Sequence, residues 1–470
     1  MSISHDAKRS RMKMSLGVCF VVAALAATAL ITFAQQEQPT IKVEVRQVLV
    51  PVVVTDRAGH HVTGLKAGDF RVYEDGVEQQ VVSFGTELSA TLPAAGAPLV
   101  VEPALAPETP LPASIHPAPI RRTYLVLLDS LFMSFDSSNR LRKALPKLFA
   151  QEQVADSQYA LVALGRDLRI VRSITRKPEE ILAAAESDAL PRAIRESSGG
   201  YFASQETQLR SMLEDYCRQC ECIDNLPPTG RPTLLESLSL CDSKFDNMEK
   251  WAAWAARERA AASRNFLMRL AEIIRLTGQQ PGKRIMILAS DGLDLWPGKD
   301  LYTLIATYTN RPTFLMRNPA VRLEHELDAV ARAATTSDVV VYSIDTRGVA
   351  PPTAGVFSAE NQGGRFVRRD AGRAISEMVT HASLIENSRQ DTLSRLADVT
   401  GGVFFRGNSD LAKGMHQAFA DEREYYVLAY APANRAEDGN FRKVRVALKD
   451  KKLKVRAKAG YWAPSQGAKP

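Results

Sequence analysis

Histidine, cysteine and recognisable catalytic motifs are scarce in this chain of 470 residues. Its 7 histidines lack the spacing of metal ligands, and no Gly-x-Ser-x-Gly elbow marks a serine hydrolase. Hydrophobic residues make up 45% of the chain and charged residues 24%, so a wholly disordered, collagen-like or coiled-coil protein is excluded. The 60 Lys and Arg residues barely exceed the 53 Asp and Glu residues, a balance too even to indicate a nucleic-acid partner.

Only one long hydrophobic run occurs in the sequence, near its N-terminus. Four basic residues at positions 8–13 precede an apolar run at residues 16–34, and three polar residues follow it. This order is typical of a signal peptide, and Thr32 and Ala34 fit cleavage after Ala34. We therefore predict that residues 1–34 are removed and that the mature protein is periplasmic or secreted. A retained N-terminal membrane anchor, which needs nearly the same length, is the alternative.

Four of the 5 cysteines lie within 25 residues. They are Cys217, Cys220, Cys222 and Cys241. In an oxidising compartment this set predicts two disulfides, with three connectivities that the sequence leaves open. A zinc site with four cysteine ligands is the rival, although the second Cys-x-x-Cys pair that such a site uses is missing. We expect the disulfides to hold an insertion, about residues 183–250, that has little core of its own.

The rest of the chain changes pattern along its length. Residues 41–86 alternate like strands, and Asp75-Gly76 between two such runs predicts a β-hairpin. Residues 87–120 contain eight prolines without periodicity, which is typical of a linker. Residues 121–424 alternate short apolar strands with helices, the pattern of a parallel sheet with helices on both faces. The strand candidates are residues 124–128, 159–164, 169–174, 284–289, 339–344 and 403–405.

The tail, residues 425–463, returns to strands. Neither this segment nor residues 41–86 has enough strands for a two-sided core. We therefore expect the two segments to form one small β-sandwich, with a doubly wound, Rossmann-like α/β domain inserted between them. A basic run at residues 449–458 would lie on the strands of this sandwich, as a solvated face or as a contact with the cell envelope.

Several sequence blocks carry a family resemblance. The N-terminal blocks are Pro-Val-Val-Val-Thr-Asp-Arg-Ala-Gly at residues 51–59, Gly-Leu-Lys-Ala-Gly-Asp-Phe at 64–70 and Tyr-Glu-Asp-Gly at 73–76. Later blocks are Lys-Arg-Ile-Met-Ile-Leu-Ala-Ser-Asp-Gly at 283–292, Tyr-Ser-Ile-Asp-Thr-Arg-Gly at 342–348 and Tyr-Tyr-Val-Leu-Ala-Tyr at 425–430. In this order they resemble the von Willebrand factor A (vWA)-related family of secreted acidobacterial proteins. The resemblance covers most of residues 43–463, apart from the linker and the insertion.

This resemblance implies a vWA-like domain with a metal-ion-dependent adhesion site at the carboxyl ends of its strands. Such a site holds Mg²⁺ or Mn²⁺ through an Asp-x-Ser-x-Ser loop, a threonine and a later aspartate, and leaves one position for a partner's carboxylate. The residues that match or lie beside this motif are Asp129, Ser130, Ser134, Thr233 and Asp291. Leu131 and Met133 occupy the two serine positions, so we predict a degenerate site. The alternative is that Asp129 and Asp291 cap neighbouring helices or turns.

Two function classes follow from these patterns. The first is an exported, non-enzymatic binding or scaffold protein whose vWA-like domain contacts a protein partner. The second is an envelope or secreted hydrolase whose catalytic site is not recognisable as a motif. Ser290-Asp291-Gly292 is explained by the family block rather than by a nucleophile, and the oligomeric state stays open.

Overall fold

The computed structural model divides the chain into two units, Met1–Arg46 and Gln47–Pro470. It describes residues 47–86, 122–151, 157–198, 201–218, 220, 234–309, 311, 321–348, 371–407, 410–422 and 424–465. The predicted signal peptide (residues 1–34), the predicted linker (residues 87–120), Cys222 and Thr233 therefore lie outside the described residues.

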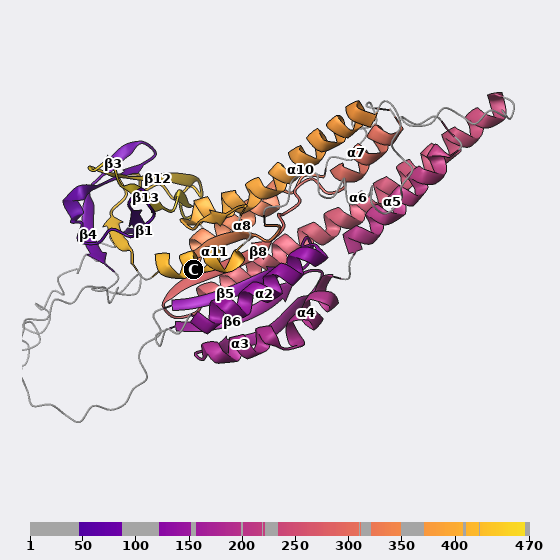
Figure 1. Cartoon of the computed structure of the whole chain (residues 1–470). Coiled ribbons are helices and arrows are strands. Elements are labelled where there is room, and N and C mark those ends of the chain that lie inside the picture. The colour runs from indigo at the N-terminus through magenta and orange to yellow at the C-terminus, as the bar shows by residue number, and fades with distance from the viewer. Residues whose placement is uncertain are drawn as a thin grey trace, which may run out of the picture. The chain divides into compact units, whose positions relative to one another are not determined.

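A six-stranded sheet forms the centre of the α/β part (Figure 1). Its strands are β5 (Arg122–Asp129), β6 (Ser157–Leu164), β7 (Leu168–Thr175), β8 (Lys283–Ser290), β9 (Val339–Asp345) and β10 (Phe404–Phe405), in the order β10-β9-β8-β5-β6-β7. The first five strands of that order are parallel. Every residue of β5, β6 and β9 is buried, as expected for parallel strands covered on both faces.

One edge strand differs from the predicted parallel arrangement, because β7 runs antiparallel to β6. Residues 165–167 join the two strands, and so short a turn permits only an antiparallel pair.

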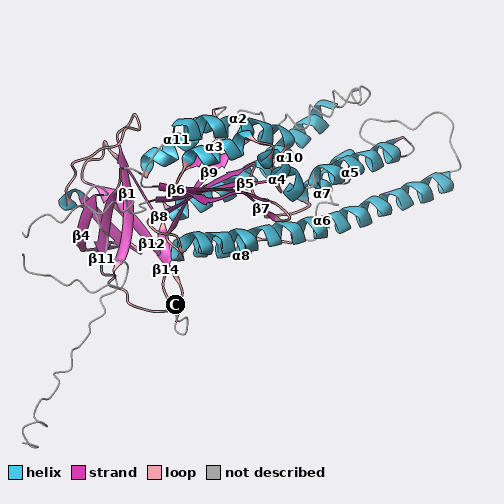
Figure 2. Ribbon diagram, turned by 90° about the horizontal axis from the view of Figure 1, so that it is seen from below, coloured by secondary structure: helices cyan, strands magenta, loops and turns pink. Residues whose placement is uncertain are grey.

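Helices cover both faces of this sheet (Figure 2). One face packs on α2 (Phe135–Gln151), α3 (Pro178–Glu186), α4 (Ala189–Ser198) and α11 (Leu411–Asp421). The other face packs on α6 (Leu234–Gly278), α8 (Glu324–Thr336) and α10 (Ala371–Thr400). The predicted mixed α/β fold, with a sheet of mainly parallel strands flanked by helices, is confirmed. None of the described helices combines the length and the apolar character needed to cross a membrane.

The region predicted as an insertion, residues 183–250, has more core than expected. Its first part belongs to α3 and α4, which cover the sheet. The rest, α5 (Tyr201–Cys217) and the first half of α6, lies side by side in Figure 1 and packs with α7 (Lys299–Tyr308). These helices enclose a separate apolar cluster that includes Leu213, Phe245 and Tyr302. The expectation of little core was wrong, because the 45-residue α6 continues beyond the sheet and buries a second apolar side there.

The predicted oxidation of the cysteines is confirmed for one pair. Cys220 and Cys241 form a disulfide that ties the end of α5 to α6. Cys217 is disulfide-bonded as well.

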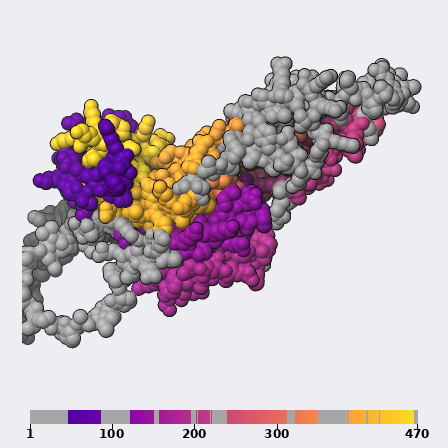
Figure 3. All heavy atoms as spheres, viewed as in Figure 1, coloured from indigo at the N-terminus to yellow at the C-terminus, as the bar shows by residue number. Residues whose placement is uncertain are grey.

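A sandwich of two four-stranded sheets is built from both ends of the chain. Its strands are β1 (Val48–Thr55), β2 (Phe70–Glu74), β3 (Val77–Gln79), β4 (Val81–Thr86), β11 (Tyr426–Tyr430), β12 (Phe441–Leu448), β13 (Lys454–Ala457) and β14 (Gly460–Trp462), with a 3-10 turn at Ala67–Asp69. The sheet orders are β13-β1-β11-β4 and β14-β12-β2-β3. Figure 3 shows the N-terminal and C-terminal segments side by side in this sandwich.

Each sheet of the sandwich mixes N-terminal and C-terminal strands. β1 pairs with β11, and β2 pairs with β12. Valines of β1 share a core with Tyr426, Leu428 and Val444, so the expected packing of the two segments is observed. The predicted hairpin turn is present too, with positive φ at Asp75 (48°) and Gly76 (87°), the geometry of a type I′ turn.

Candidate functional site

The candidate metal residues lie at the carboxyl edge of the six-stranded sheet, where β5, β8 and β9 end. Asp129 is the last residue of β5, and Asp291 follows β8. Because β5, β8 and β9 are parallel neighbours, the residues at their ends converge. The exposed fraction is 0% for Asp129 and 8% for Asp291, so the two carboxylates are enclosed by the chain.

Both carboxylate oxygens of Asp129 accept hydrogen bonds from within the chain. Oδ1 accepts from the backbone N–H groups of Leu131 (3.0 Å) and Phe132 (3.1 Å), and Oδ2 accepts from the Ser290 hydroxyl (2.5 Å). Burial raises the pKa of Asp129 to about 7, against the lowering effect of these hydrogen bonds and with a further rise from the nearby Asp291. Asp129 therefore caps the turn between β5 and α2.

Both carboxylate oxygens of Asp291 also accept hydrogen bonds from within the chain. Its Oδ2 accepts from the backbone N–H of Ser134 (2.8 Å), and its Oδ1 accepts from the Thr346 hydroxyl (2.5 Å). The hydroxyl of Ser134 donates instead to Ser137 (2.8 Å), in the first turn of α2. Ser130 is buried, and its backbone N–H donates to the carbonyl of Leu164 (2.8 Å).

These contacts do not fit a divalent cation. Mg²⁺ needs a set of near-octahedral oxygen ligands, whereas the oxygens of Asp129 and Asp291 already accept hydrogen bonds and the Ser134 hydroxyl is directed to α2. In the described ranges, no group of three or more His, Cys, Asp or Glu side chains is arranged to hold a metal ion.

Sequence reasoning missed three residues that complete this edge. Thr346 bonds to Asp291, and Arg140 donates to the Thr346 carbonyl (3.1 Å). Asp345 accepts from the guanidinium of Arg347 (3.0 Å) and from the amide of Gln390 (2.9 Å). Asp345 and Thr346 could have been found from their place at the end of a predicted strand, next to the end of β8. Arg140 gave no such signal, because it reaches the edge from α2.

Helices close over the same edge. A Cβ added at Gly292 would meet the Cβ of Arg389, on α10, at 2.7 Å, and Arg389 donates to Asp294 (3.2 Å). Next to them, Nη1 of Arg259, on α6, donates to both carboxylate oxygens of Asp300, on α7 (2.9 and 2.7 Å). At Gly292, α10 therefore packs directly against the edge that would receive a partner's carboxylate in an adhesion-type site.

A large aromatic side chain remains open beside this edge. Phe135 begins α2, directly after Ser134, and 80% of its surface is exposed. The rest of the aromatic cluster near it is packed, since the ring of Phe132 lies 5.4 Å from Phe266 and 5.8 Å from Phe202. Phe135 is thus the accessible apolar group of the carboxyl edge in the described part of the chain.

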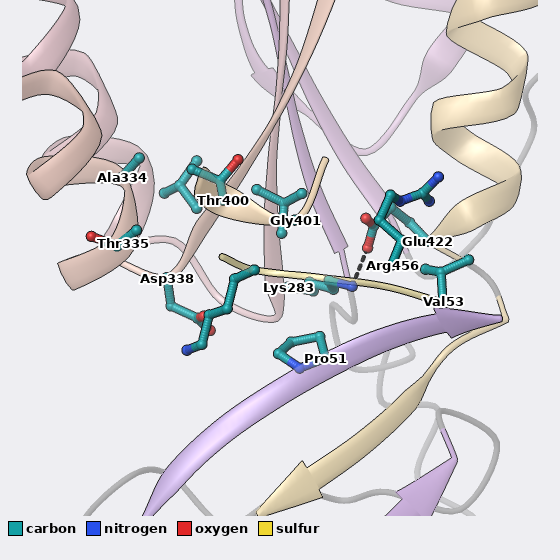
Figure 4. Close-up of a pocket in the computed structure, with 13 residues that line it drawn as sticks. Pro51, Val53, Lys283, Ala334, Thr335, Asp338, Thr400, Gly401, Glu422 and Arg456 are labelled. Carbon is teal, nitrogen blue, oxygen red and sulfur yellow. Dashed lines mark ion pairs between the residues drawn. The ribbon is translucent and has the colours of Figure 1, made fainter. Parts of the chain in front are cut away.

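A second crevice lies where the sandwich meets the opposite, amino edge of the sheet (Figure 4). Two of its cations are paired, whereas Lys458, which also lines it, has no ion-pair partner among the described residues. Lys283 forms an ion pair with Glu422, which also accepts from the Tyr342 hydroxyl (2.6 Å). Arg456 of β13 donates to Asp421 (2.5 Å). We interpret this crevice as a structural junction, because Lys283, Glu422 and Arg456 are held in ion pairs within the fold.

Comparisons with known proteins found no matching family model and no matching curated protein. Solved structures do match. An aerotolerance-related membrane protein from Bacteroides fragilis is 13% identical, over 63% of this chain and 98% of that chain, with a TM-score of 0.27. The protein BatB from Bacteroides thetaiotaomicron is 12% identical, over 64% and 98%, with a TM-score of 0.24. Proximal thread matrix protein 1 of the mussel byssus, with a zinc-occupied MIDAS motif, is 10% identical, over 59% and 48%, with a TM-score of 0.18. At these TM-scores the likenesses carry no argument about family or function.

Proposed function

We propose that this chain is an exported, non-enzymatic binding or scaffold protein whose vWA-like domain engages a protein partner without a metal ion. The observation that carries the proposal is the internal hydrogen bonding of Asp129 and Asp291. An adhesion-type site needs these oxygens for the ion, and here they hold together the turns after β5, β8 and β9.

The same geometry disfavours the alternative of a hydrolase at this edge. The Ser290 hydroxyl is fully buried and donates to Asp129, so a substrate cannot reach it. A nucleophile needs an accessible position beside a base.

Export is supported by the Cys220–Cys241 disulfide, since such bonds persist in oxidising compartments. The signal-peptide pattern of residues 1–34 points the same way.

Phe135 is the residue that we assign to the partner contact. Exposed aromatic side chains at the centre of interfaces supply much of the binding energy. Phe135 has the largest exposed fraction among the large apolar side chains in the described ranges.

Capture of partners from an envelope extract tests this function. The immobilised protein is used with Mg²⁺ and with a chelator, next to the variants Phe135→Ser and Ile170→Ser. Ile170, on the edge strand β7, is 65% exposed and serves as the matched control. We expect one captured protein that persists in chelator, is lost with Phe135→Ser and is kept with Ile170→Ser. Loss in chelator would contradict metal-free binding, and equal capture by both variants would contradict the role of Phe135.

A further inference from the structure

Positive charge is concentrated in one segment of the sandwich, residues 443–458, which we call the basic segment. It has eight Lys and Arg residues against one Asp, a net charge of +7, and the whole chain also carries +7. Its cations are Lys443, Arg445, Lys449, Lys451, Lys452, Lys454, Arg456 and Lys458. Arg456 pairs with Asp421, whereas the other seven have no ion-pair partner among the described residues. The excess charge of the protein is therefore gathered here, and most of it is not compensated by ion pairs with the described residues.

A groove of about 300 Å³ runs through this segment, between β12 and β13. Val444 and Val446, which are 4% and 8% exposed, and the half-buried Val455 form its apolar floor, and Arg445 and Lys458 supply charge. The guanidinium of Arg445 is held 4.1 Å from the centre of the Tyr73 ring. Asp398 is the one acidic residue among those that line the groove. A ligand for this groove combines apolar groups with negative charge.

Among the described strands, β12 and β13 each lack a strand partner along part of one edge. β12 pairs with β2 along residues 444–448, but on its other side it pairs with β14 only at residues 441–443. β13 pairs with β1 and ends its sheet. The chain crosses from one sheet to the other between β13 and β14, where the N–H of Val444 donates to the carbonyl of Ala459 (2.8 Å). Figure 1 shows β12 and β13 close together, and they belong to different sheets.

We propose that this groove binds an extended, acidic polypeptide segment of a partner, which adds as a strand to the open edge of β12 or β13. Unpaired strand edges bind extended peptides through main-chain hydrogen bonds, while side chains give specificity. Along β12 the buried Val444 and Val446 alternate with the exposed Arg445, so a strand that alternates apolar and acidic residues would present matching groups on the two faces. The groove is separate from the carboxyl edge and from Phe135. A negative result for one of the two proposed sites therefore does not refute the other.

The probe is a synthetic eight-residue peptide of alternating Val and Glu, with blocked ends, titrated into the whole protein by calorimetry. A Val–Lys peptide tests charge. Two peptides N-methylated at alternate residues test strand addition, because each removes the N–H donors of one peptide edge. We expect the Val–Lys peptide to bind at least about tenfold more weakly, and at least one N-methylated peptide to lose about tenfold in affinity. These comparisons leave the protein unchanged, so misfolding cannot affect them.

Protein variants then locate the site. Arg445→Glu with Lys454→Glu reverses two exposed charges of the basic segment, and Lys143→Glu with Lys147→Glu makes the same change on the exposed side of α2. The first pair should weaken binding at least about tenfold, and the second should leave it within about twofold. Equal effects of the two pairs would overturn the proposal. Undiminished binding of both N-methylated peptides would overturn it too, because strand addition needs the N–H donors of the peptide. Displacement by polyphosphate or phosphatidylglycerol vesicles, as complete as by excess Val–Glu peptide, would also overturn it, because a generic polyanion surface would then explain the binding.

Discussion

Replacing Asp129 by Asn should change how the stability of this protein depends on pH. Asn has nearly the same shape, and its amide can keep hydrogen bonds to the backbone of Leu131 and to Ser290. The variant lacks the ionisation, however. The pKa of Asp129 is raised from 3.8 to about 7 in the folded protein, chiefly because the carboxyl is buried. The folded state therefore holds this proton more tightly than the unfolded state does.

The direction and magnitude of this pH effect follow from the difference in proton binding between the folded and unfolded states. Between the two pKa values the folded state binds more protons, so the stabilisation is complete below pH 3.8 and is lost as pH rises to about 7. Each pKa unit corresponds to about 1.4 kcal/mol, which gives about 4 kcal/mol over the whole window. From about pH 5 to pH 8 the free energy of unfolding of the wild type should fall by about 2.5 kcal/mol relative to that of Asp129→Asn.

Urea unfolding of both proteins across that pH range measures this difference. Other titrating groups cancel because the two chains differ at one residue. Asp246→Asn is the matched control, since Asp246 is exposed on α6, and its difference from the wild type should be nearly constant. A flat difference for Asp129→Asn as well, or one of opposite sign, would refute the assignment of Asp129 as a buried carboxyl held by the chain's own donors.

Three further predictions concern metal binding, the helical region and the disulfide. Mg²⁺ or Mn²⁺ should leave the melting temperature unchanged. A bound ion at a hundredfold excess over its dissociation constant would instead stabilise the protein by about 2.7 kcal/mol. A rise in melting temperature that Asp129→Ala abolishes would show a working metal site. Arg259→Met should destabilise the protein by about 3–5 kcal/mol, because it leaves Asp300 without its buried partner. Adding Asp300→Leu should restore most of the lost stability. A double variant no more stable than Arg259→Met would contradict this prediction. Cys241→Ser should lower the free energy of unfolding by about 3 kcal/mol, because Cys220 is 21 residues away, and an unchanged urea midpoint would argue against that disulfide.

Much of the fold could be predicted because short apolar runs are good markers of buried strands. Residues 124–128 and 284–289 lie inside β5 and β8, and the order of the parallel strands puts Asp129 and Asp291 at one edge. The association of the two β segments could also be predicted, from the small number of strands in each. β7 was placed correctly, but its direction depends on the length of one turn.

The details of the candidate site could not be predicted, because they depend on turn geometry. A motif reading assigns Ser134 to the metal through its hydroxyl, whereas the folded loop presents its backbone N–H to Asp291. Leu131 likewise contributes its N–H to Asp129. Main-chain donors are the same for every residue type except proline, so the sequence does not indicate which of them converge on a carboxylate. The apolar cluster between α5, α6 and α7 was missed because it unites helices on both sides of β8 in the chain.

Because each sheet of the sandwich combines N-terminal and C-terminal strands, paired strands are synthesised at different times. Val48 pairs with Tyr430, so 382 residues separate the synthesis of the two partners. At about 5–20 residues per second, β1 waits roughly 20–75 s for β11. Through that interval β1 lacks both of its sheet neighbours, because β13 follows β11 in the chain, while the strands and helices of the α/β part have already been made. A chain that stops before β11 therefore cannot form the sheet that contains β1.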